Sequence, residues 1–382
     1  MHGTPCQILS SLILILSLGY KYFAVITPSI YDLTLTELQE LISSWMQPSY
    51  RATQIWEGIY RHLWNKPEQF TILSKKVLEN LFQSFSLPVA SNDLSLIRPV
   101  QILKSSDGET IKTLFNLPDN HAIEAVLMRY AKRRTLCIST QAGCAMGCVF
   151  CATGQMGFKR HLSSGEIIQQ VLYYARLLAT LGEQVTNIVI MGMGEPFHNY
   201  TATMDAIDRL NHPKGYNFSA RRFTISTVGL IPEIQRFTQE HRQINLAVSL
   251  HAADDELRTS LLPINKKYPL DDLLATCLEY VLETRRRISF EWALIHDIND
   301  NLVHARQLAT RLKPFIINQA ALCHVNIILL NPTKRYFGRA TTRQRAQEFA
   351  AELESSGIPC TIRLRRGIDI QAGCGQLATQ NI

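Results

Sequence analysis

Short apolar, β-branched runs alternate with helical stretches from about residue 133 onward, and this alternation is the main structural signal of the chain. Alternation of this regularity predicts parallel βαβ units, and hence a barrel, a partial barrel or a doubly wound sheet. The intervening segments show helical spacing, as from Ser164 to Leu181. The expected strands are, in order, TLCIST, VTNIVIM, RFTISTV, INLAVSL, RISFEWALI, HVNIILL and CTIRLR.

The preceding part of the chain has a different pattern. Thr34 and Glu37 form a capping box, and apolar residues follow at helical spacing, which predicts a helix and further helical pieces to about Ser86. Residues 97–117 alternate around Asp107-Gly108, a strong hairpin signal. We therefore expect a small helical module joined to a β-hairpin.

An apolar run extends from Ile8 to Tyr20 and is followed by Lys21. It is too short to span a bilayer comfortably. No Lys or Arg precedes it and no clear small-residue cleavage site follows, so it differs from a signal peptide. We interpret it as an over-extended translation start; a membrane anchor and a helical extension are the alternatives. We expect a cytoplasmic protein with no stable membrane partner.

Composition narrows the class of protein. With 382 residues, 46% of them hydrophobic and 19% charged, the chain is long and apolar enough to bury a core. The net charge of +7 favours a polyanionic partner without distinguishing RNA from other anions. Nine cysteines are an odd number, and their clustering between Cys144 and Cys151 is unlike a secreted disulfide framework. A metal site in a reducing compartment fits better.

The segment Cys144-Ala-Met-Gly-Cys148-Val-Phe-Cys151 follows the strand expected from Leu136 to Thr140. Three thiolates in one loop can hold three irons of a 4Fe-4S cluster and leave the fourth iron open to a small chelating molecule. The alternative is a structural zinc site, which needs a fourth ligand such as His161 or Cys137. Zinc ligands normally come as separated pairs, so the compressed triplet favours an iron-sulfur cluster.

This spacing resembles that of the radical SAM superfamily, and more of the chain is similar to the RlmN/Cfr family of radical SAM RNA (adenine) methyltransferases. Matching segments extend from about Tyr50 to Leu377. They include IEAVLM, TLCIST-QAGC, CVFCATGQMGF, MGMGEP, ISTVGLIP, LAVSLHA, LLPINKKYPL, IHDINDN, HVNIILLNP and RGIDIQAGCGQL. The first 30 residues and the segment PTKRYFGRATT after Asn331 have no clear counterpart.

The resemblance implies an α/β fold, a radical SAM partial (β/α)6 barrel with additions at both ends. We divide the chain into the apolar extension 1–30, a helical and hairpin module that contacts RNA (31–122), the radical SAM core (123–358) and a C-terminal extension carrying a catalytic cysteine (359–382).

The resemblance also implies the chemistry. Members of the family methylate C2 or C8 of adenosine, carbons that are not nucleophilic enough to attack a sulfonium, so a radical route is needed. Two molecules of S-adenosyl-L-methionine (SAM) would be used per turnover. The methyl carrier would be Cys374 in QAGCGQL, a fitting nucleophile as a thiolate. Cys137 would form a disulfide with the carrier and release the product, and Glu124 would be the proton acceptor. A buried strand cysteine and a surface carboxylate are the structural alternatives.

Family positions that bind SAM correspond to polar or glycine-bearing segments at the ends of expected strands. Glu195 can accept a hydrogen bond from the SAM ammonium group, and neighbouring glycines allow close backbone approach. The expected SAM-binding residues are Gly194, Glu195, Ser226, Ser249, Leu250, His251 and Asn331, and the cluster ligands are Cys144, Cys148 and Cys151.

RNA, either 23S rRNA or tRNA, is the expected substrate, and basic clusters would bind it. The clusters are Lys132 to Arg134, Arg221-Arg222, Arg285 to Arg287, and Arg363 with Arg365-Arg366; we favour the first and last because they flank the catalytic cysteines. A flavodoxin or ferredoxin is the generic electron donor.

Regiochemistry is the open point of this interpretation. The GEP sequence at residues 194–196 is typical of the C2 enzymes, whereas GIDI and HVN resemble the C8 enzymes of the antibiotic-resistance type at least as well. We expect C2 methylation, with C8 methylation as the alternative. A non-enzymatic iron-sulfur or zinc RNA-binding module, a membrane-anchored protein and a radical SAM enzyme with a non-RNA substrate are the rival functions.

Overall fold

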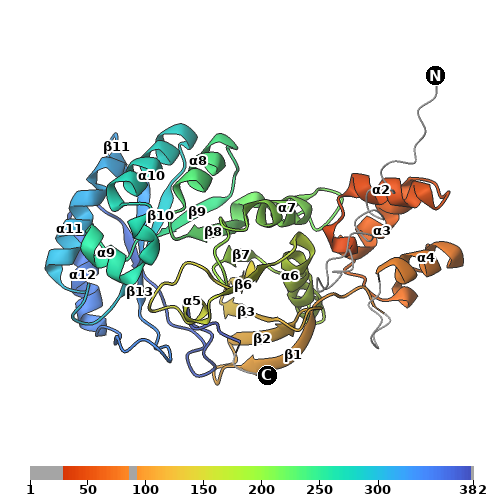
Figure 1. Cartoon of the computed structure of the whole chain (residues 1–382), viewed down its shortest axis with the longest axis horizontal. Coiled ribbons are helices and arrows are strands. Elements are labelled where there is room, and N and C mark those ends of the chain that lie inside the picture. The colour runs from red at the N-terminus through yellow and green to blue at the C-terminus, as the bar shows by residue number, and fades with distance from the viewer. Residues whose placement is uncertain (1–28, 86–92, 380–382) are drawn as a thin grey trace, which may run out of the picture.

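The computed structural model describes residues 29–85 and 93–379 (Figure 1). The apolar run from Ile8 to Tyr20 lies outside the described residues, and so does every interpretation of it. None of the helices in the described part of the chain combines the length and hydropathy needed to cross a membrane.

The predicted strands form one 10-stranded sheet in the order β1-β2-β3-β4-β7-β8-β9-β10-β13-β14. Pairing is antiparallel from β1 to β4 and parallel from β4 to β14. The strands are β1 (Arg98–Lys104), β2 (Thr110–Asn116), β3 (Ala122–Tyr130), β4 (Arg133–Cys137), β7 (Asn187–Ile190), β8 (Phe223–Thr227), β9 (Asn245–Ser249), β10 (Ile288–Leu294), β13 (Cys323–Leu329) and β14 (Cys360–Ile362). The expected partial barrel is confirmed.

Helices connect the parallel strands, as the alternation predicted, and the N-terminal helices gather at one end of the molecule beyond α6 and α7 (Figure 1). The helices are α2 (Leu35–Ser44), α3 (Tyr50–Tyr60), α4 (Lys75–Phe85), α5 (Ala152–Met156), α6 (Ser164–Ala179), α7 (Tyr200–Asn211), α8 (Ile231–Gln239), α9 (Asp255–Leu261), α10 (Leu270–Thr284), α11 (Leu302–Leu312) and α12 (Arg343–Ser355). Two small antiparallel pairs, β5 (Gln141–Gly143) with β6 (Phe158–His161) and β11 (Ile316–Ile317) with β12 (Ala320–Ala321), complete the fold.

One aspartate of the N-terminal module caps a helix of the core, and the module also packs against the core through apolar side chains. The Thr34–Glu37 capping box is present and starts α2. Before it, Asp32 Oδ1 accepts hydrogen bonds from the Gly165 N–H at 2.7 Å and from Ser164 Oγ at 3.0 Å. These donors lie in the first turn of α6, where unpaired N–H groups and the helix dipole favour a carboxylate. The contact therefore joins the module to α6, the helix that follows β6.

The Asp107-Gly108 hairpin is confirmed, with Gly108 donating its N–H to the Ser105 carbonyl oxygen at 2.8 Å. Its strands β1 and β2 pair onward through β3 to β4, so the hairpin is continuous with the sheet of the core. The domain boundaries remain a prediction, but the hairpin and the barrel share one sheet.

The strand expected from Leu136 to Thr140 ends earlier, at Cys137. Ser139 leaves the ladder because its N–H donates to Gln170 Oε1 at 2.8 Å and its hydroxyl donates to the Glu124 carbonyl oxygen at 2.6 Å. Side-chain partners thus replace strand partners, and the chain turns into the cysteine loop.

Candidate active site

The three cysteines of the C-x3-C-x2-C loop lie between β5 and α5. Cys144 and Cys148 are buried, Cys151 is half-buried, and all three line one cavity of about 430 Å³ inside the barrel. A cavity of a few hundred cubic ångströms is typical of sites for small molecules. The predicted cluster ligands are therefore brought to one place.

The environment of these thiols favours a bound cationic group. Burial, followed by the negative charge of neighbouring groups, raises the pKa of Cys144 to about 12 and raises that of Cys148 well above its usual range. A coordinated metal reverses this balance by stabilising the thiolates. In the described residues, no three His, Cys, Asp or Glu side chains converge on a point suited to a single metal ion. Cluster thiolates each bind their own iron and do not require such convergence.

Two glycines allow the close approaches that shape the site. Gly143 has φ +75°, and a Cβ there would lie 1.9 Å from the Gly157 carbonyl oxygen, which accepts the Cys144 N–H at 3.1 Å. Gly194 has φ +101°, and a Cβ there would lie 2.6 Å from Cβ of Gln141. Both positions need the left-handed conformation that glycine adopts without strain.

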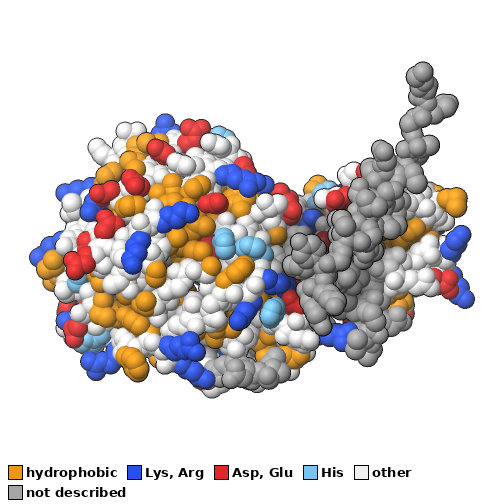
Figure 2. Space-filling model, in the orientation of Figure 1, with side chains coloured by type: hydrophobic (Ala, Val, Ile, Leu, Met, Phe, Trp, Pro, Cys, Tyr) orange, Lys and Arg blue, Asp and Glu red, His pale blue; other side chains and the backbone are white. Residues whose placement is uncertain are grey.

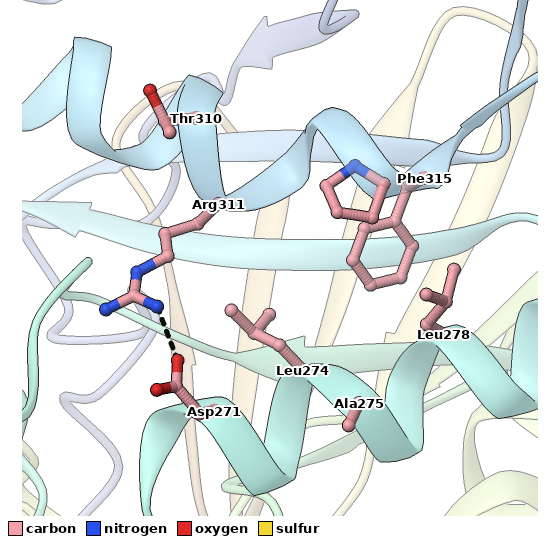
Figure 3. A pocket seen from close by; sticks show the side chains of 8 residues that line it. Asp271, Leu274, Ala275, Leu278, Thr310, Arg311 and Phe315 are labelled. Atoms are coloured by element: carbon pink, nitrogen blue, oxygen red, sulfur yellow. Dashed lines mark hydrogen bonds and ion pairs between the residues drawn. The ribbon is translucent and has the colours of Figure 1, made fainter.

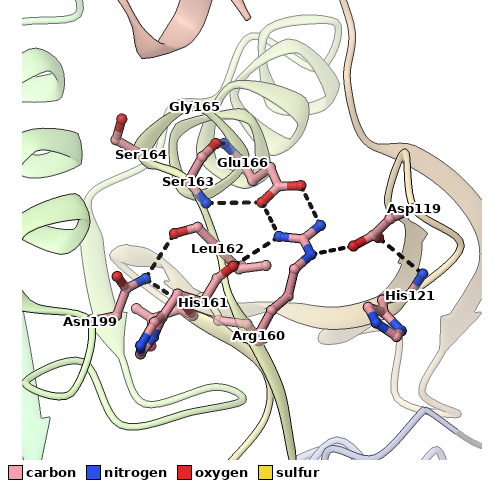
Figure 4. Close-up of polar contacts among 12 residues, drawn as sticks. Asp119, His121, Arg160, His161, Leu162, Ser163, Ser164, Gly165, Glu166 and Asn199 are labelled. Carbon is pink, nitrogen blue, oxygen red and sulfur yellow. Dashed lines mark hydrogen bonds and ion pairs between the residues drawn. The ribbon is translucent and has the colours of Figure 1, made fainter. Parts of the chain in front are cut away.

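A salt-bridge network behind the loop fixes β6 (Figure 4). Arg160 binds both carboxylate oxygens of Glu166, at 2.7 and 2.8 Å, and also pairs with Asp119 from the β2–β3 turn. The neighbouring His161 does not line the cavity; its Nδ1 lies 3.0 Å from Nε2 of Gln141. Of the two ligands considered for a zinc site, only Cys137 faces the cavity.

Glu195 is buried at the edge of the cavity, as its expected role requires. Its Oε1 accepts the Phe197 N–H at 3.0 Å and its Oε2 accepts the Val228 N–H at 2.9 Å. Burial raises the pKa of Glu195 to about 7, although these hydrogen bonds oppose the shift. An ammonium group next to this carboxylate would restore its charge.

The other expected SAM-binding residues lie around the same cavity, with one exception. Ser226, Ser249, His251 and Asn331 line it together with Gly194 and Glu195. Leu250 does not line it; it is fully buried and donates its N–H to the Glu291 carbonyl oxygen at 3.0 Å. Burial lowers the pKa of His251 to about 3, and its Nδ1 accepts the Ala293 N–H at 2.9 Å, so the ring is neutral.

Arg258, which the sequence analysis missed, holds the ends of two strands. Its fully buried guanidinium donates to the carbonyl oxygens of Val228 at 2.8 Å, Ser249 at 3.2 Å and Leu250 at 3.3 Å. It follows no expected strand, so its sequence position gave no signal of this role.

Cys137 and Cys374 are free and line the same cavity as the cluster cysteines. Burial raises the pKa of each thiol to about 12. The negative charge of Cys374 also raises the pKa of Cys137, and the negative charge of Glu291 raises that of Cys374. Cys374 is accessible from the cavity, whereas Cys137 is half-buried on β4. Both surroundings favour the thiol over the thiolate.

The Cys374 loop is fastened to both the cysteine loop and the end of β13. Asn331 Nδ2 donates to the Cys374 carbonyl oxygen at 3.0 Å, while its Oδ1 accepts from Arg365 Nε at 3.1 Å. The Ala152 N–H donates to the Gly375 carbonyl oxygen at 2.7 Å. Asn331 thus positions the Cys374 loop, in addition to lining the cavity where SAM is expected.

Glu124 is buried, which excludes the surface-charge alternative, but it does not line the cavity. Its Oε1 lies 3.0 Å from Nζ of Lys112, and its Oε2 accepts the Ala378 N–H at 3.0 Å. Burial raises the pKa of Glu124. In this arrangement its carboxylate fastens the C-terminal segment.

The segment after Asn331, which has no counterpart in the resemblance, packs against the cysteine loop. Gln155 Nε2 donates to Thr333 Oγ1 at 3.1 Å, and the rings of Phe150 and Tyr336 meet edge to face with centroids 6.4 Å apart. It therefore packs beside the cysteine loop, although none of residues 332–342 lines the cavity.

The basic clusters separate into two groups. Arg133, Arg363, Arg365 and Arg366 line the cavity, and the guanidinium groups of Arg133 and Arg366 lie 5.1 and 4.7 Å from the ring centroid of Tyr130. Arg221-Arg222 and Arg285 to Arg287 precede β8 and β10, at the amino-terminal edge of the parallel sheet. On the face shown in Figure 2, basic and acidic side chains are interspersed. The last favoured cluster thus lies at the cavity with all three arginines, whereas Lys132 to Arg134 reaches it only through Arg133, since Arg134 is paired with Glu183.

A second hollow lies between α10 and the end of α11, lined by Leu274, Leu278 and Phe315 and bordered by the Arg311–Asp271 ion pair (Figure 3). It contains none of the predicted site residues and lies on the helical layer.

Comparisons with known proteins agree with the geometry. Residues 138–308 match the family model of the radical SAM superfamily. A probable dual-specificity RNA methyltransferase RlmN of Chloroflexus aurantiacus is 43% identical over 362 residues, which are 94% of each chain. Dual-specificity RNA methyltransferase RlmN 1 of Myxococcus xanthus is 45% identical over 350 residues, 91% of this chain and 94% of the relative.

Among solved structures, a radical SAM methyltransferase from Sphaerobacter thermophilus superposes with a TM-score of 0.87 at 46% identity. The match covers 92% of this chain and 99% of that one.

Proposed function

The chain belongs to the RlmN family of radical SAM RNA methyltransferases, and from this premise we propose that it methylates C2 of adenosine in 23S rRNA, tRNA or both, through a methyl group carried on Cys374. It is an enzyme of the radical SAM superfamily, which implies a 4Fe-4S cluster and SAM. The observation that carries the proposal is the placement of Cys374 and Cys137 in the cavity lined by Cys144, Cys148 and Cys151.

The residues present fit both cofactors. Three buried thiols in one loop provide the cluster ligands, and Glu195 provides an acceptor for the SAM ammonium group. When bound, the two cofactors supply the one-electron chemistry that an amidine-type carbon requires. The chain itself binds SAM and holds the carrier.

Cys374 is the proposed carrier because it lines the cavity of the expected cluster ligands and its loop is fixed on both sides. Consumption of two SAM molecules per turnover follows from this role, one to methylate the cysteine and one to activate the methyl group. Cys137 is the proposed resolving cysteine, which forms a disulfide with Cys374 and frees the methylated RNA.

Glu124 remains a proposed proton acceptor for the substituted carbon. Its carboxylate is tied to Lys112 and to the Ala378 N–H, so this role requires the C-terminal segment to move away from it. Arg133 and Arg366 beside Tyr130 are proposed contacts for RNA phosphates and for an extruded base. A flavodoxin or ferredoxin is the proposed electron donor.

The test is to reconstitute the enzyme anaerobically and incubate it with SAM, a reductant and transcripts of rRNA or tRNA, with nucleosides identified by mass spectrometry. We expect 2-methyladenosine. Formation of 8-methyladenosine would transfer the chain to the resistance-type branch. Cleavage of SAM without methylation of any transcript would contradict the proposed RNA substrates.

A further inference from the structure

Glu291 is a buried carboxylate of the cavity that no step described so far uses. It lies on β10, is only 4% exposed, and lines the cavity with Cys374. Its Oε1 accepts a hydrogen bond from Asn326 Nδ2 at 2.7 Å and lies 3.9 Å from Nη2 of Arg363. Burial raises the pKa of Glu291, and the Arg363 cation and the Asn326 amide oppose this shift.

The sheet register places Glu291 between the expected SAM-binding residues and the segment that leads to Cys374. Ser249, Glu291 and Asn326 are direct partners across β9, β10 and β13, so their side chains project to the same face. Ser249 belongs to the expected SAM-binding set, and Arg363 begins the segment that leads to Cys374. The Glu291 carbonyl oxygen also accepts the His251 N–H at 3.3 Å.

Methylation of Cys374 requires a group that accepts the proton of its thiol. Since its surrounding favours the thiol, the sulfur must lose a proton as it takes the methyl group. Glu291 and Cys374 line the same cavity, and the negative charge of Glu291 adds to the effect of burial in raising the pKa of the Cys374 thiol. Glu195 and Glu291 are the only carboxylates of the described residues that line the cavity; Glu195 accepts two backbone N–H groups and is the expected partner of the SAM ammonium group, and Glu124 pairs with Lys112 outside the cavity lining.

We propose that Glu291 is the proton acceptor for the Cys374 thiol during methylation of the carrier. The Cys374 sulfur forms a bond to the methyl carbon, the bond between that carbon and the sulfonium sulfur breaks, and its electron pair remains on the departing S-adenosylhomocysteine. The thiol proton passes to the Glu291 carboxylate, and from there to solvent. This inference rests on the proposed role of Cys374 as methyl carrier.

The experiment compares Glu291→Gln with wild-type enzyme of equal cluster content. Each protein is mixed with SAM that carries a trideuterated methyl group, and the labelled Cys374 peptide is followed by mass spectrometry in a single turnover. General-base catalysis is typically worth about 10²- to 10⁴-fold, so we expect labelling to slow by at least about 100-fold. Glu291→Asp, which keeps a carboxylate, should recover part of the rate. Glu352→Gln, a carboxylate on α12 paired with Arg306, is the control and should label at the wild-type rate.

A second readout separates chemistry from misplacement of the loop. Alkylation of Cys374 by iodoacetamide without SAM should be no slower in Glu291→Gln, because loss of a neighbouring negative charge favours the thiolate. Equal slowing of alkylation and methylation would show a displaced loop and would overturn the proposal, as would a loss of SAM binding.

Two further outcomes are distinct from these. Normal labelling of Cys374 in Glu291→Gln, combined with loss of RNA methylation, would make Glu291 a contact for the substrate base and would refute the proton-acceptor role. Absence of the label from Cys374 in the wild-type enzyme would instead refute the carrier mechanism itself.

Discussion

Lys112 Nζ lies 3.0 Å from Glu124 Oε1, and both side chains are less than 10% exposed. Lys112 Nζ also donates to the Gln371 carbonyl oxygen at 3.2 Å, and Glu124 accepts the Ala378 N–H. One buried ion pair on β2 and β3 therefore holds the segment that carries Cys374 at two points, on either side of the cysteine.

Lys112→Met should destabilise the protein by about 3 kcal/mol, because it leaves a buried carboxylate without its cation. The variant raises the pKa of Glu124 in the folded state further above its unfolded value, so the deficit should grow as pH rises from 5 to 8. Thermal or urea unfolding measures it. Lys75→Met, which removes an exposed ion pair with Glu79, should cost less than about 1 kcal/mol. Equal losses in both variants would contradict the finding.

Cys374→Ala should keep the cluster and bind SAM but lose methyl transfer to RNA. The physical reason is that the variant removes the sulfur that takes the methyl group, while Cys144, Cys148 and Cys151 remain in place. Iron content, equilibrium binding of SAM and nucleoside mass spectrometry check the three parts. Normal turnover would exclude the carrier role.

Cys137→Ala should accumulate a covalent adduct between RNA and the protein, because the thiol needed to release the product is absent. A denaturing gel with labelled RNA detects the adduct. Cys277→Ala is the matched control, since Cys277 is fully buried in α10 and does not line the cavity. Free methylated RNA in normal yield from Cys137→Ala would argue against resolution by a disulfide.

Arg366→Gln should weaken RNA binding and reduce the slope of log K against log salt concentration by about 1, as expected for one lost phosphate contact. Arg287→Gln, at the opposite edge of the sheet, should leave both unchanged. Filter binding or fluorescence anisotropy at several salt concentrations measures the slope. The same loss in both variants would mean that RNA is attracted by overall charge.

Glu195 should make stability depend on pH. Its folded pKa of about 7 lies above the usual value near 4.5, so its contribution is fully present below pH 4.5 and is lost as pH rises to 7. The difference corresponds to about 3 kcal/mol. Relative to Glu195→Gln, the wild-type protein without SAM should lose unfolding free energy over this range. A constant difference between the two proteins from pH 4.5 to 8 would contradict the environment described for Glu195.

The sequence pattern predicted the structural features that depend on residues close to one another in the chain. The β-branched runs became the strands of the parallel sheet, and the Thr34–Glu37 box and the Asp107-Gly108 turn form as expected, because each depends on neighbours a few residues away. Strand ends were less predictable. Ser139 leaves its ladder for Gln170 and Glu124, which are distant in the sequence.

The same distinction applies to the site. Motif spacing and resemblance located the cluster cysteines, Cys137, Cys374 and most of the SAM-binding set at one cavity. Glu291 and Arg258 were missed because a single acid within an apolar strand and a single base on a helix resemble many others. Their importance comes from partners that only the tertiary structure supplies.

The hydrogen bonds that hold the Cys374 segment also bear on how the chain folds and on how the cavity opens. The Ala378–Glu124 and Ser106–Asp369 hydrogen bonds join residues 254 and 263 positions apart in the chain. Contacts of such long range close large loops, so we expect this wall of the cavity to form after the barrel has folded. An edge held by a few bonds is expected to detach more readily than the barrel in the native state. We therefore expect hydrogen exchange at Ala378 to proceed through local opening, which would make the cavity accessible to a bulky nucleic acid while the barrel stays folded.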